Sequence, residues 1–201
     1  MAKPSWLNIS PASGSGNGTI SNSSGAHTGR LKREGIVTVT GIGVSTPSTY
    51  KVIQTPKAEF VSFDGGTELA VSKGGGMLAV SGKSNSAKLA FEWVGTSDVA
   101  LPSSYQAAGQ SVSNGAVIDG DPGATSEYEY SFSLSFPNNS TTDEIVRTMK
   151  VTANGGQSAQ IAIKQAAGDA FLSVAPTEIT IPQDGSAVSV QVTSNTDWSV
   201  S

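Results

Sequence analysis

The residue types that could do chemistry are few and lie far apart in this chain. His27 is the single histidine, in a segment rich in Ser and Gly that predicts a loop. A general base needs a positioned nucleophile and an orienting carboxylate, and no motif around His27 supplies either. The chain has no cysteine, which removes thiolate nucleophiles, thiolate metal ligands and disulfides. We therefore predict an exposed loop histidine and a protein that is not an enzyme.

Two small groups of carboxylates resemble sites only in part. Asp119 and Asp121 flank Gly120, and such a pair can begin a calcium site when further oxygen ligands arrive from neighbouring loops. The same residue types are ordinary in turns, and the remaining spaced acidic ligands are missing here. Glu127 and Glu129 alternate with apolar residues, as on the solvated face of a strand. We favour a plain turn and predict no metal and no other cofactor.

Binding to phosphate, nucleic acid or a membrane is also disfavoured. The glycines at 74–76 are not followed by Lys-Ser/Thr at P-loop spacing, and no helix is expected after them. The net charge is −4 without a Lys/Arg cluster, which provides no basic surface for DNA or RNA. No stretch approaches the roughly 20 apolar residues that span a bilayer, and residues 1–7 lack the apolar region of a secretory signal. As written, we expect a product made and kept in a cytoplasm, or released on lysis.

Three aromatic residues could provide a flat surface on which sugar rings stack. Trp93 and Tyr128 lie in alternating segments that favour burial in a core. Tyr105 lies in the small-residue stretch 96–123, which predicts a long loop, and such loops carry recognition on rigid scaffolds. Tyr105 is therefore the candidate contact for a glycan or a protein partner.

The elements that must position these residues are strands. Residues 127–136 alternate strictly between apolar or aromatic and polar side chains, which predicts a sandwich strand with one buried face. Asn154-Gly155-Gly156 predicts a hairpin between strands at 146–153 and 159–165, because Asn-Gly readily adopts positive φ. Further strands are predicted at 35–40, 50–54, 77–81, 88–94, 178–181 and 187–193. The predicted fold class is all-β.

An internal repeat organises these strands. The segment from Phe60 to Asn85 recurs about 110 residues later, from Phe171 to Asn195, with one residue dropped near its start. Residues 51–54 and 162–165 are a second matching pair, each a short apolar strand that closes on Gln. The glycines at 74–76 align with 184–186, which makes them a repeat turn. The register predicts three parts: residues 1–57 as the second half of a module, 58–168 as a complete module with an inserted loop near 98–124, and 169–201 as the first half of another module.

Both ends carry the residues of a known family. The run from Pro176 to Trp198, the string Ser5-Trp6-Leu7 with the residues that follow it, and the closing Gln54 together resemble the BACON family of immunoglobulin-like β-sandwich modules. The middle repeat is more divergent, since Lys88 stands where the register places Trp198.

The resemblance implies tandem immunoglobulin-like (BACON-like) β-sandwiches in which Trp6 and Trp198 are core residues. Together with the alternating strands and the repeat, it gives the predicted core: Trp6, Phe60, Trp93, Tyr128, Phe132, Phe171 and Trp198.

The resemblance also implies two functional classes. Similar modules occur in virion proteins of phages that infect gut Bacteroidales, including crAss-like phages. We therefore expect a structural or decoration protein of a virion, as an auxiliary capsid, head-fibre or tail component whose partners are like subunits or capsid or tail proteins. Family members also accompany glycan-degrading proteins, so the alternative is a carbohydrate- or mucin-binding adhesion module at a bacterial cell surface, with host-surface or mucin glycans as ligands.

The complementary ends leave two explanations open. Residues 169–201 of one subunit could complete residues 3–56 of a neighbour by strand exchange, because neither half alone covers a core or satisfies its edge strands. The sequence could instead be part of a longer array.

Overall fold

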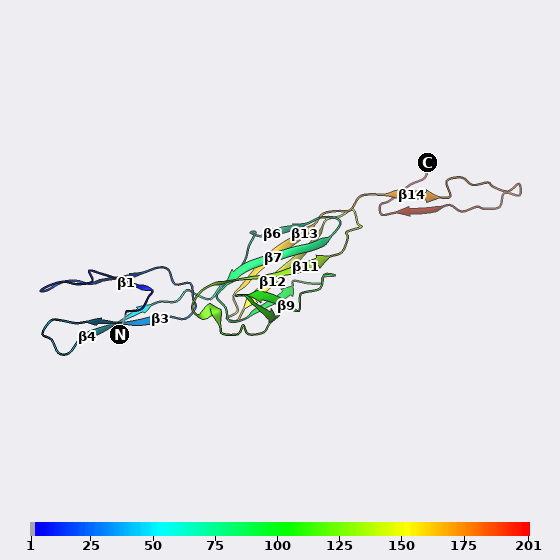
Figure 1. The fold of residues 1–201 in the computed structure, drawn as a ribbon. Helices are drawn as coiled ribbons and strands as arrows, with labels where there is room; N and C mark the ends of the chain where they lie inside the picture. The colour runs from blue at the N-terminus through cyan, green and yellow to red at the C-terminus, as the bar shows by residue number, and fades with distance from the viewer. Residues whose placement is uncertain (1–2) are drawn as a thin grey trace.

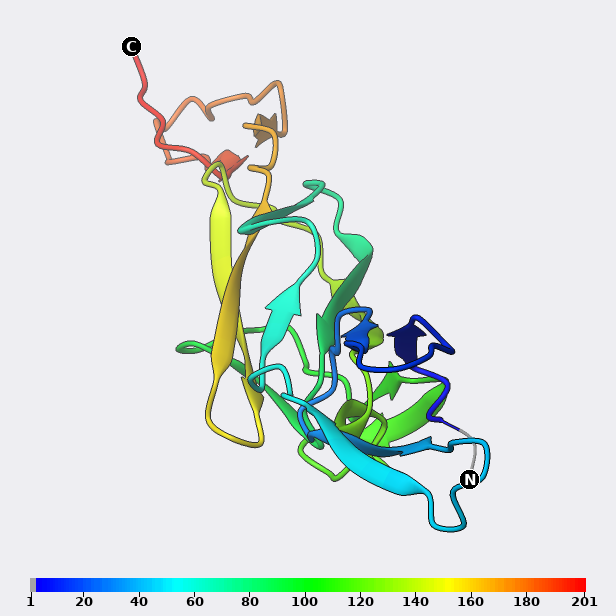
Figure 2. The same cartoon turned by 90° about the vertical axis from the view of Figure 1, so that its left-hand side faces the viewer.

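The computed structural model describes residues 3–201 as an all-β chain of three parts arranged in a line. Figure 1 shows hairpins from residues 3–56 at one end, a β-sandwich in the middle, and one hairpin from residues 169–201 at the opposite end. The view turned by 90° keeps the two terminal parts on opposite sides of the sandwich (Figure 2). One short 3₁₀ turn, η1 (Pro122–Ala124), is the only helical element among the described residues.

The central module consists of two packed sheets. The five-stranded sheet has the order β10-β9-β11-β7-β5, and the four-stranded sheet has the order β6-β13-β12-β8. All of their ladders are antiparallel except that between β6 and β13, which is parallel. The strands are β5 (Val61–Phe63), β6 (Glu68–Val71), β7 (Gly76–Ser84), β8 (Leu89–Trp93), β9 (Ser104–Ala107), β10 (Gln110–Ser113), β11 (Tyr128–Phe136), β12 (Ile145–Ala153) and β13 (Ser158–Gln165).

The core lies between these sheets and is centred on Phe91. Strand β11 alternates strictly between buried and exposed residues, as the sequence predicts, and it buries Tyr128 and Phe132. The Phe91 ring lies 4.7 Å from that of Phe132, 5.1 Å from that of Tyr105 and 5.5 Å from that of Tyr130, measured between ring centroids. Tilted and edge-to-face pairs of this kind add to the apolar burial. Trp93 packs against this core while half-buried, and its indole N–H donates to the Val99 carbonyl over 2.7 Å.

The predicted hairpin at Asn154-Gly155-Gly156 is confirmed. Strands β12 and β13 pair antiparallel across it, and the turn is closed by the Gly156 amide, which donates to the Ala153 carbonyl over 3.0 Å. Gly156 has φ +88, a left-handed conformation that glycine adopts without steric cost.

The terminal parts contain only two-stranded sheets. At the N-terminal end β1 (Leu7–Ser10) pairs with β2 (Ser21–Ser24), and β3 (Arg33–Val39) pairs with β4 (Ser48–Gln54). At the C-terminal end β14 (Leu172–Ala175) pairs with β15 (Gln191–Ser194). An isolated two-stranded hairpin is marginal in water because it cannot bury an apolar face on its own.

The repeat found in the sequence is reproduced in the pairing registers. Leu172 lies opposite Ser194 in β14–β15, as Val61 lies opposite Ser84 in β5–β7. Gln54 is paired with the first residue of β3, as Gln165 is paired with the first residue of β12. The C-terminal part therefore has the pairing of the first half of the central module, and the N-terminal part that of its second half.

Three sequence predictions about strands need correction. The strand predicted at 187–193 begins only at β15 (Gln191–Ser194), and residues 187–190 belong to no strand. Residues 178–181 are predicted as a strand but form none, because their counterpart β6 pairs with β13, and the corresponding partner β4 lies at the other end of the molecule. The stretch near 98–124 is predicted as a loop but contains the β9–β10 hairpin, which extends the five-stranded sheet.

Four of the predicted core residues lie outside the buried core, and two of these four are exposed. Phe171 is 48% exposed and Trp198 is 54% exposed, because residues 169–201 lack the second half of a module that would cover them. Trp6 is half-buried, with the Arg33 guanidinium 4.6 Å from its ring centroid, and Phe60 is half-buried at the boundary between the N-terminal part and the central module.

Equivalent valines in a complete module and a half-module provide a direct stability test. Val80 is 1% exposed in β7, and Val190, at the same repeat position, is 39% exposed. We expect Val80→Ala to lower the free energy of unfolding of the central module by about 2 kcal/mol and Val190→Ala by less than about 0.5 kcal/mol. Urea unfolding followed by Trp93 fluorescence at low protein concentration measures both. Equal losses would contradict this description of the core.

Candidate functional site: the module joints and the half-modules

Tyr105, the residue singled out for glycan or partner contact, is not available for either. Its side chain is 2% exposed and packs edge-to-face on Phe91 inside the sandwich. Burial raises the pKa of its hydroxyl. Residues 104–107 form strand β9 and turn this side chain inward, so the expectation that Tyr105 is free in a loop is wrong.

Of the titratable residues weighed in the sequence, Asp121 and Glu127 link the N-terminal part to the central module, whereas the contact of His27 is local. His27 is half-buried between β2 and β3, with its Nε2 atom 2.6 Å from the Leu31 carbonyl oxygen. Asp121 forms a two-point ion pair with the Arg30 guanidinium, which joins the N-terminal part to the central module. Glu127 accepts from the Lys57 ammonium over 2.9 Å across the same boundary. No cluster of three or more His, Cys, Asp or Glu side chains suited to a metal occurs among residues 3–201.

The structure also shows the predicted solvated residue Glu129 and the predicted repeat turn at 74–76. Glu129 lies on the exposed face of β11, 3.8 Å from the Lys83 ammonium. The glycines at 74–76 form a turn in which the Gly75 amide donates to the Ser72 carbonyl over 3.0 Å, and the Gly185 amide donates to the Pro182 carbonyl over 2.9 Å in the same way. The repeat turn predicted at these positions is therefore confirmed.

The joint between the N-terminal part and the central module is organised by Asn85. This side chain is fully buried, and its Oδ1 atom accepts from the Phe60 amide over 2.9 Å. Its Nδ2 atom donates to the carbonyls of Thr28 and Ala58, over 3.1 and 3.2 Å. One amide group thus links β7, the connecting segment before β5, and the loop after β2, with every hydrogen bond within ordinary range.

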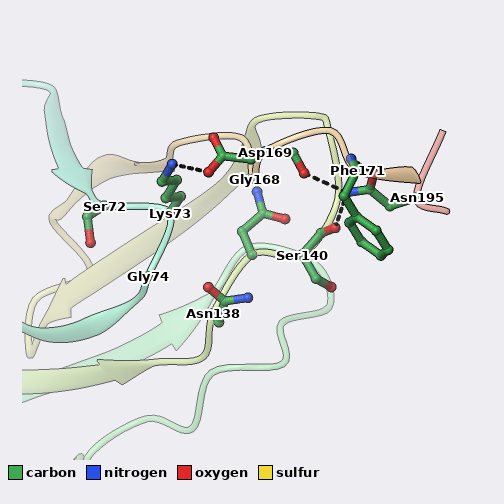
Figure 3. A pocket seen from close by; sticks show the side chains of 10 residues that line it. Ser72, Lys73, Gly74, Asn138, Ser140, Gly168, Asp169, Phe171 and Asn195 are labelled. Atoms are coloured by element: carbon green, nitrogen blue, oxygen red, sulfur yellow. Dashed lines mark hydrogen bonds and ion pairs between the residues drawn. The ribbon is translucent and has the colours of Figure 1, made fainter. Parts of the chain in front are cut away.

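The joint between the central module and the C-terminal part repeats this arrangement. Asn195 Oδ1 accepts from the Phe171 amide over 2.9 Å, and its Nδ2 atom donates to the carbonyls of Ser140 and Asp169, each over 2.9 Å. The neighbouring serines repeat as well, since Ser84 donates to the Phe60 carbonyl and Ser194 to the Phe171 carbonyl. Figure 3 shows Asn195 and Phe171 beside Ser140 and Asp169 at this joint. The two joints are built from equivalent residues with equivalent contacts.

The second joint is less completely filled than the first. At the first joint, the Arg30 and Leu31 amides donate to the carbonyls of Gly123 and Ala124, and the Glu127 amide donates to Thr28 Oγ1. These central-module residues belong to the second half of a module, which residues 169–201 do not include. The second joint instead has an open cavity of about 500 Å³ beside Phe171 and Asn195.

The cavity is shown in Figure 3. Its walls come from Ser72, Lys73, Gly74, Asn138, Asn139, Ser140, Gly168, Asp169, Phe171 and Asn195.

A second repeated contact involves the glutamine that closes each hairpin. Gln165 is fully buried, donates to the Pro137 carbonyl over 2.6 Å and accepts from Arg147 over 3.1 Å. Gln54 donates to the Gly25 carbonyl over 2.8 Å and accepts from Arg33 over 2.8 Å. The N-terminal part is therefore folded locally as the second half of a module, although no first half covers it within residues 3–201.

Both terminal parts expose large apolar side chains, and some of these occupy repeat positions that the central module buries. Val71 is 8% exposed in the central module, and its counterpart Ile181 is 62% exposed. The exposed set in residues 169–201 is Phe171, Leu172, Val174, Ile179, Ile181, Val188, Val190, Trp198 and Val200, and the set in residues 3–56 is Ile20, Leu31, Ile36, Val39, Ile42, Val44 and Ile53.

Sequence reasoning missed the role of the two asparagines, although it contained the signal. Ser-Asn recurs at the end of the aligned segments, which identifies Asn85 and Asn195 as repeat positions but not as joint residues. Their partners, Thr28 and Ser140, lie far away in sequence, so only the structure places them together. The ion pair between Arg30 and Asp121 carried no sequence signal at all.

Comparison with known proteins leaves the function open. No family model and no curated protein matches the chain. Among solved structures, domains 4–9 of the surface layer protein SbsC match with 12% identity and a TM-score of 0.37 over 81% of this chain. Extracellular cadherin domains 1–5 of protocadherin gamma B2 match with 9% identity and a TM-score of 0.38 over 96% of it. The chain spans 24% and 38% of those structures, and neither match assigns it an activity.

The joint asparagines should limit the motion between neighbouring parts of the chain. We expect Asn85→Ala to lower the free energy of unfolding by about 2 kcal/mol, because it leaves the Phe60 amide and two carbonyls without their hydrogen-bond partner. The same change should loosen the first joint. Spin labels on Ser45→Cys and Ser133→Cys, in a chain without native cysteine, report the spread of distances across that joint.

Asn114→Ala is the matched control for this experiment. Asn114 makes the same kind of two-way contact, with the Phe91 amide and carbonyl, but entirely inside the central module. The distance distribution should broaden for Asn85→Ala and keep its width for Asn114→Ala. Equal widths in the two variants would show that Asn85 does not hold the joint.

Proposed function

We propose that this chain is a non-enzymatic structural protein whose immunoglobulin-like modules assemble into a linear array. The observation that carries the proposal is the repeated joint, in which Asn85 and Asn195 make the same three hydrogen bonds with equivalent partners. A joint that recurs with the same geometry extends a rod in a defined direction, as in solenoid and array proteins.

The physical character of the surfaces supports an assembly role. The central module is fully packed, and its buried polar side chains Asn85 and Gln165 are hydrogen-bonded. The terminal parts instead offer strand edges and apolar faces, which are the features by which β-proteins add strands from a partner. Binding by strand edges and side-chain shape needs no ionisable group, which agrees with the structural roles of His27 and Asp121.

We further propose that the array belongs to a bacteriophage virion, as an auxiliary capsid, head-fibre or tail component. The support is the resemblance of residues 3–56 and 169–201 to BACON modules, which occur in such virion proteins. The alternative, a glycan- or mucin-binding module at a bacterial surface, would need a surface other than Tyr105, since that residue is buried in the core.

The virion role and the bacterial-surface role predict different binding partners. If the chain is a virion component, it should sediment with intact phage particles through a density gradient. Mass spectrometry of its peptides should then show many copies per particle. Detection only in uninfected bacteria would contradict the virion role. Binding of the purified chain to a mucin glycan array, retained in a Tyr105→Phe variant, would favour the surface module instead.

A further inference from the structure

We propose that a second copy of this chain completes the terminal half-modules: residues 172–201 of one copy supply the first half of a sandwich whose second half is residues 3–56 of the next copy. The inference deepens the proposed assembly role and does not depend on the virion assignment. Its starting point is the central module, in which both halves are present and every inter-half pairing can be read directly.

The central module shows how the two halves join in the four-stranded sheet. Strand β6 runs parallel to β13, with Leu69 beside Ile163. Transferred along the repeat, this register places Ile179 of one copy beside Val52 of the next. Ile163 is fully buried in the complete module, whereas Val52 is half-buried and Ile179 is exposed in a single chain. The transferred pairing would therefore cover both side chains.

The same register brings opposite charges together. Glu68 lies beside Ala162 in the central module, and the corresponding residues are Glu178 on the donated strand and Lys51 on β4. Lys51 projects from the exposed face of β4, where its ammonium contacts Glu34 over 2.6 Å. Hydrogen bonds from Lys32 and Lys51 lower the pKa of Glu34 to about 2, so that carboxylate stays ionised on the outer face. In the completed sheet Lys51 would lie between two carboxylates, Glu34 and Glu178.

The five-stranded sheet provides a second, independent fit. In the central module β7 pairs with β11, with Val80 opposite Phe132 and Gly82 opposite Tyr130. A Cβ on Gly82 would collide with the Tyr130 ring, so the pair combines the smallest residue with a large one.

The transferred pairs in this sheet keep the apolar character of the contact. They place Val190 opposite Ile20, which keeps an apolar pair, and Val192 opposite Gly18, which puts the larger residue on the other strand. A large side chain that faces a small one avoids the collision that two large residues would make.

The joint cavity is continuous with this interface. At the first joint, the central module's second half contacts the N-terminal part through Glu127, whose amide donates to Thr28 and whose carboxylate accepts from Lys57. The counterparts of Thr28 and Lys57 at the second joint are Ser140 and Gly168, and both line the open cavity. A second half supplied by another copy would therefore bring its own loop before β2 against this cavity.

Residues 3–56 and 169–201 of one copy cannot complete each other. The two half-modules lie at opposite ends of the molecule with the central sandwich between them (Figure 1). The contact is therefore between copies and joins two different surfaces, so it generates an open head-to-tail filament or a closed ring.

The first test is the mass of the intact chain in solution. Light scattering and sedimentation should show a mass that grows with concentration through dimers and higher multiples. Glu178→Lys and Lys51→Glu, each alone, should weaken association about fivefold, because an attractive cross-strand pair becomes repulsive, and an equimolar mixture of the two variants should recover association. Lys32→Glu is the control, since it also removes a contact to Glu34 but lies outside β4.

The second test fixes the register with cysteines in a chain that has none. Ser135 lies opposite Met77 in the central module, on the exposed face, and the corresponding residues are Ser23 and Ala187. Oxidation of Ser23→Cys/Ala187→Cys should give a ladder of covalent multimers. Asn22→Cys/Ala187→Cys, in which the two thiols face opposite sides of the sheet, should not.

Each outcome bears on the inference. A monomer at every concentration, or ladders of equal yield from both cysteine pairs, would overturn it. A monomeric chain that still sediments with phage particles would refute the strand exchange and leave the virion role intact. A chain that forms multimers with the predicted register but is absent from phage particles would support the strand exchange and refute the virion role.

Discussion

The structure depends on one constraint: a strand in a sandwich needs partners on its edges and a second sheet over its apolar face. The central module meets this requirement, with β11 held between β7 and β9 and its aromatic face covered by the opposite sheet. The terminal parts have the same sequence pattern and the same local registers but only half of the strands. At some repeat positions the side chain buried in the central module is exposed in a terminal part, as for Val190 against Val80 and Ile181 against Val71.

Buried amides give the array its direction. Asn85 and Gln165 lie in the interior with their hydrogen-bonding groups engaged by backbone atoms of separate segments. A fully satisfied polar group inside a low-dielectric interior favours one arrangement strongly, because any other leaves it unpaired. Because Asn195 repeats the contacts of Asn85, the orientation set at one joint is set again at the next.

The sequence predicted the features that are encoded locally or by repetition. Alternation predicted the buried face of β11, Asn154-Gly155-Gly156 predicted a hairpin, and the repeat placed Phe60 and Phe171 in equivalent settings. It failed where a partner decides the outcome: residues 178–181 have the pattern of a strand but no neighbouring strand to pair with. It also failed for Tyr105, since a short edge strand among small residues has little periodicity to detect. The joints join residues far apart in the chain, so their partners could not be read from spacing.

If the terminal half-modules become complete modules when copies meet, the two terminal segments gain their hydrogen-bond partners at the same time. Amide hydrogen exchange along the chain, followed as the protein concentration is raised, measures this most directly. We expect the amides of residues 177–190, and those of residues 48–54 that are not paired with β3, to exchange freely in dilute solution and to become protected together as concentration rises, while those of β11 and β12 are protected throughout. Exchange in the two terminal segments that is fast at every concentration, or protection of one without the other, would contradict it.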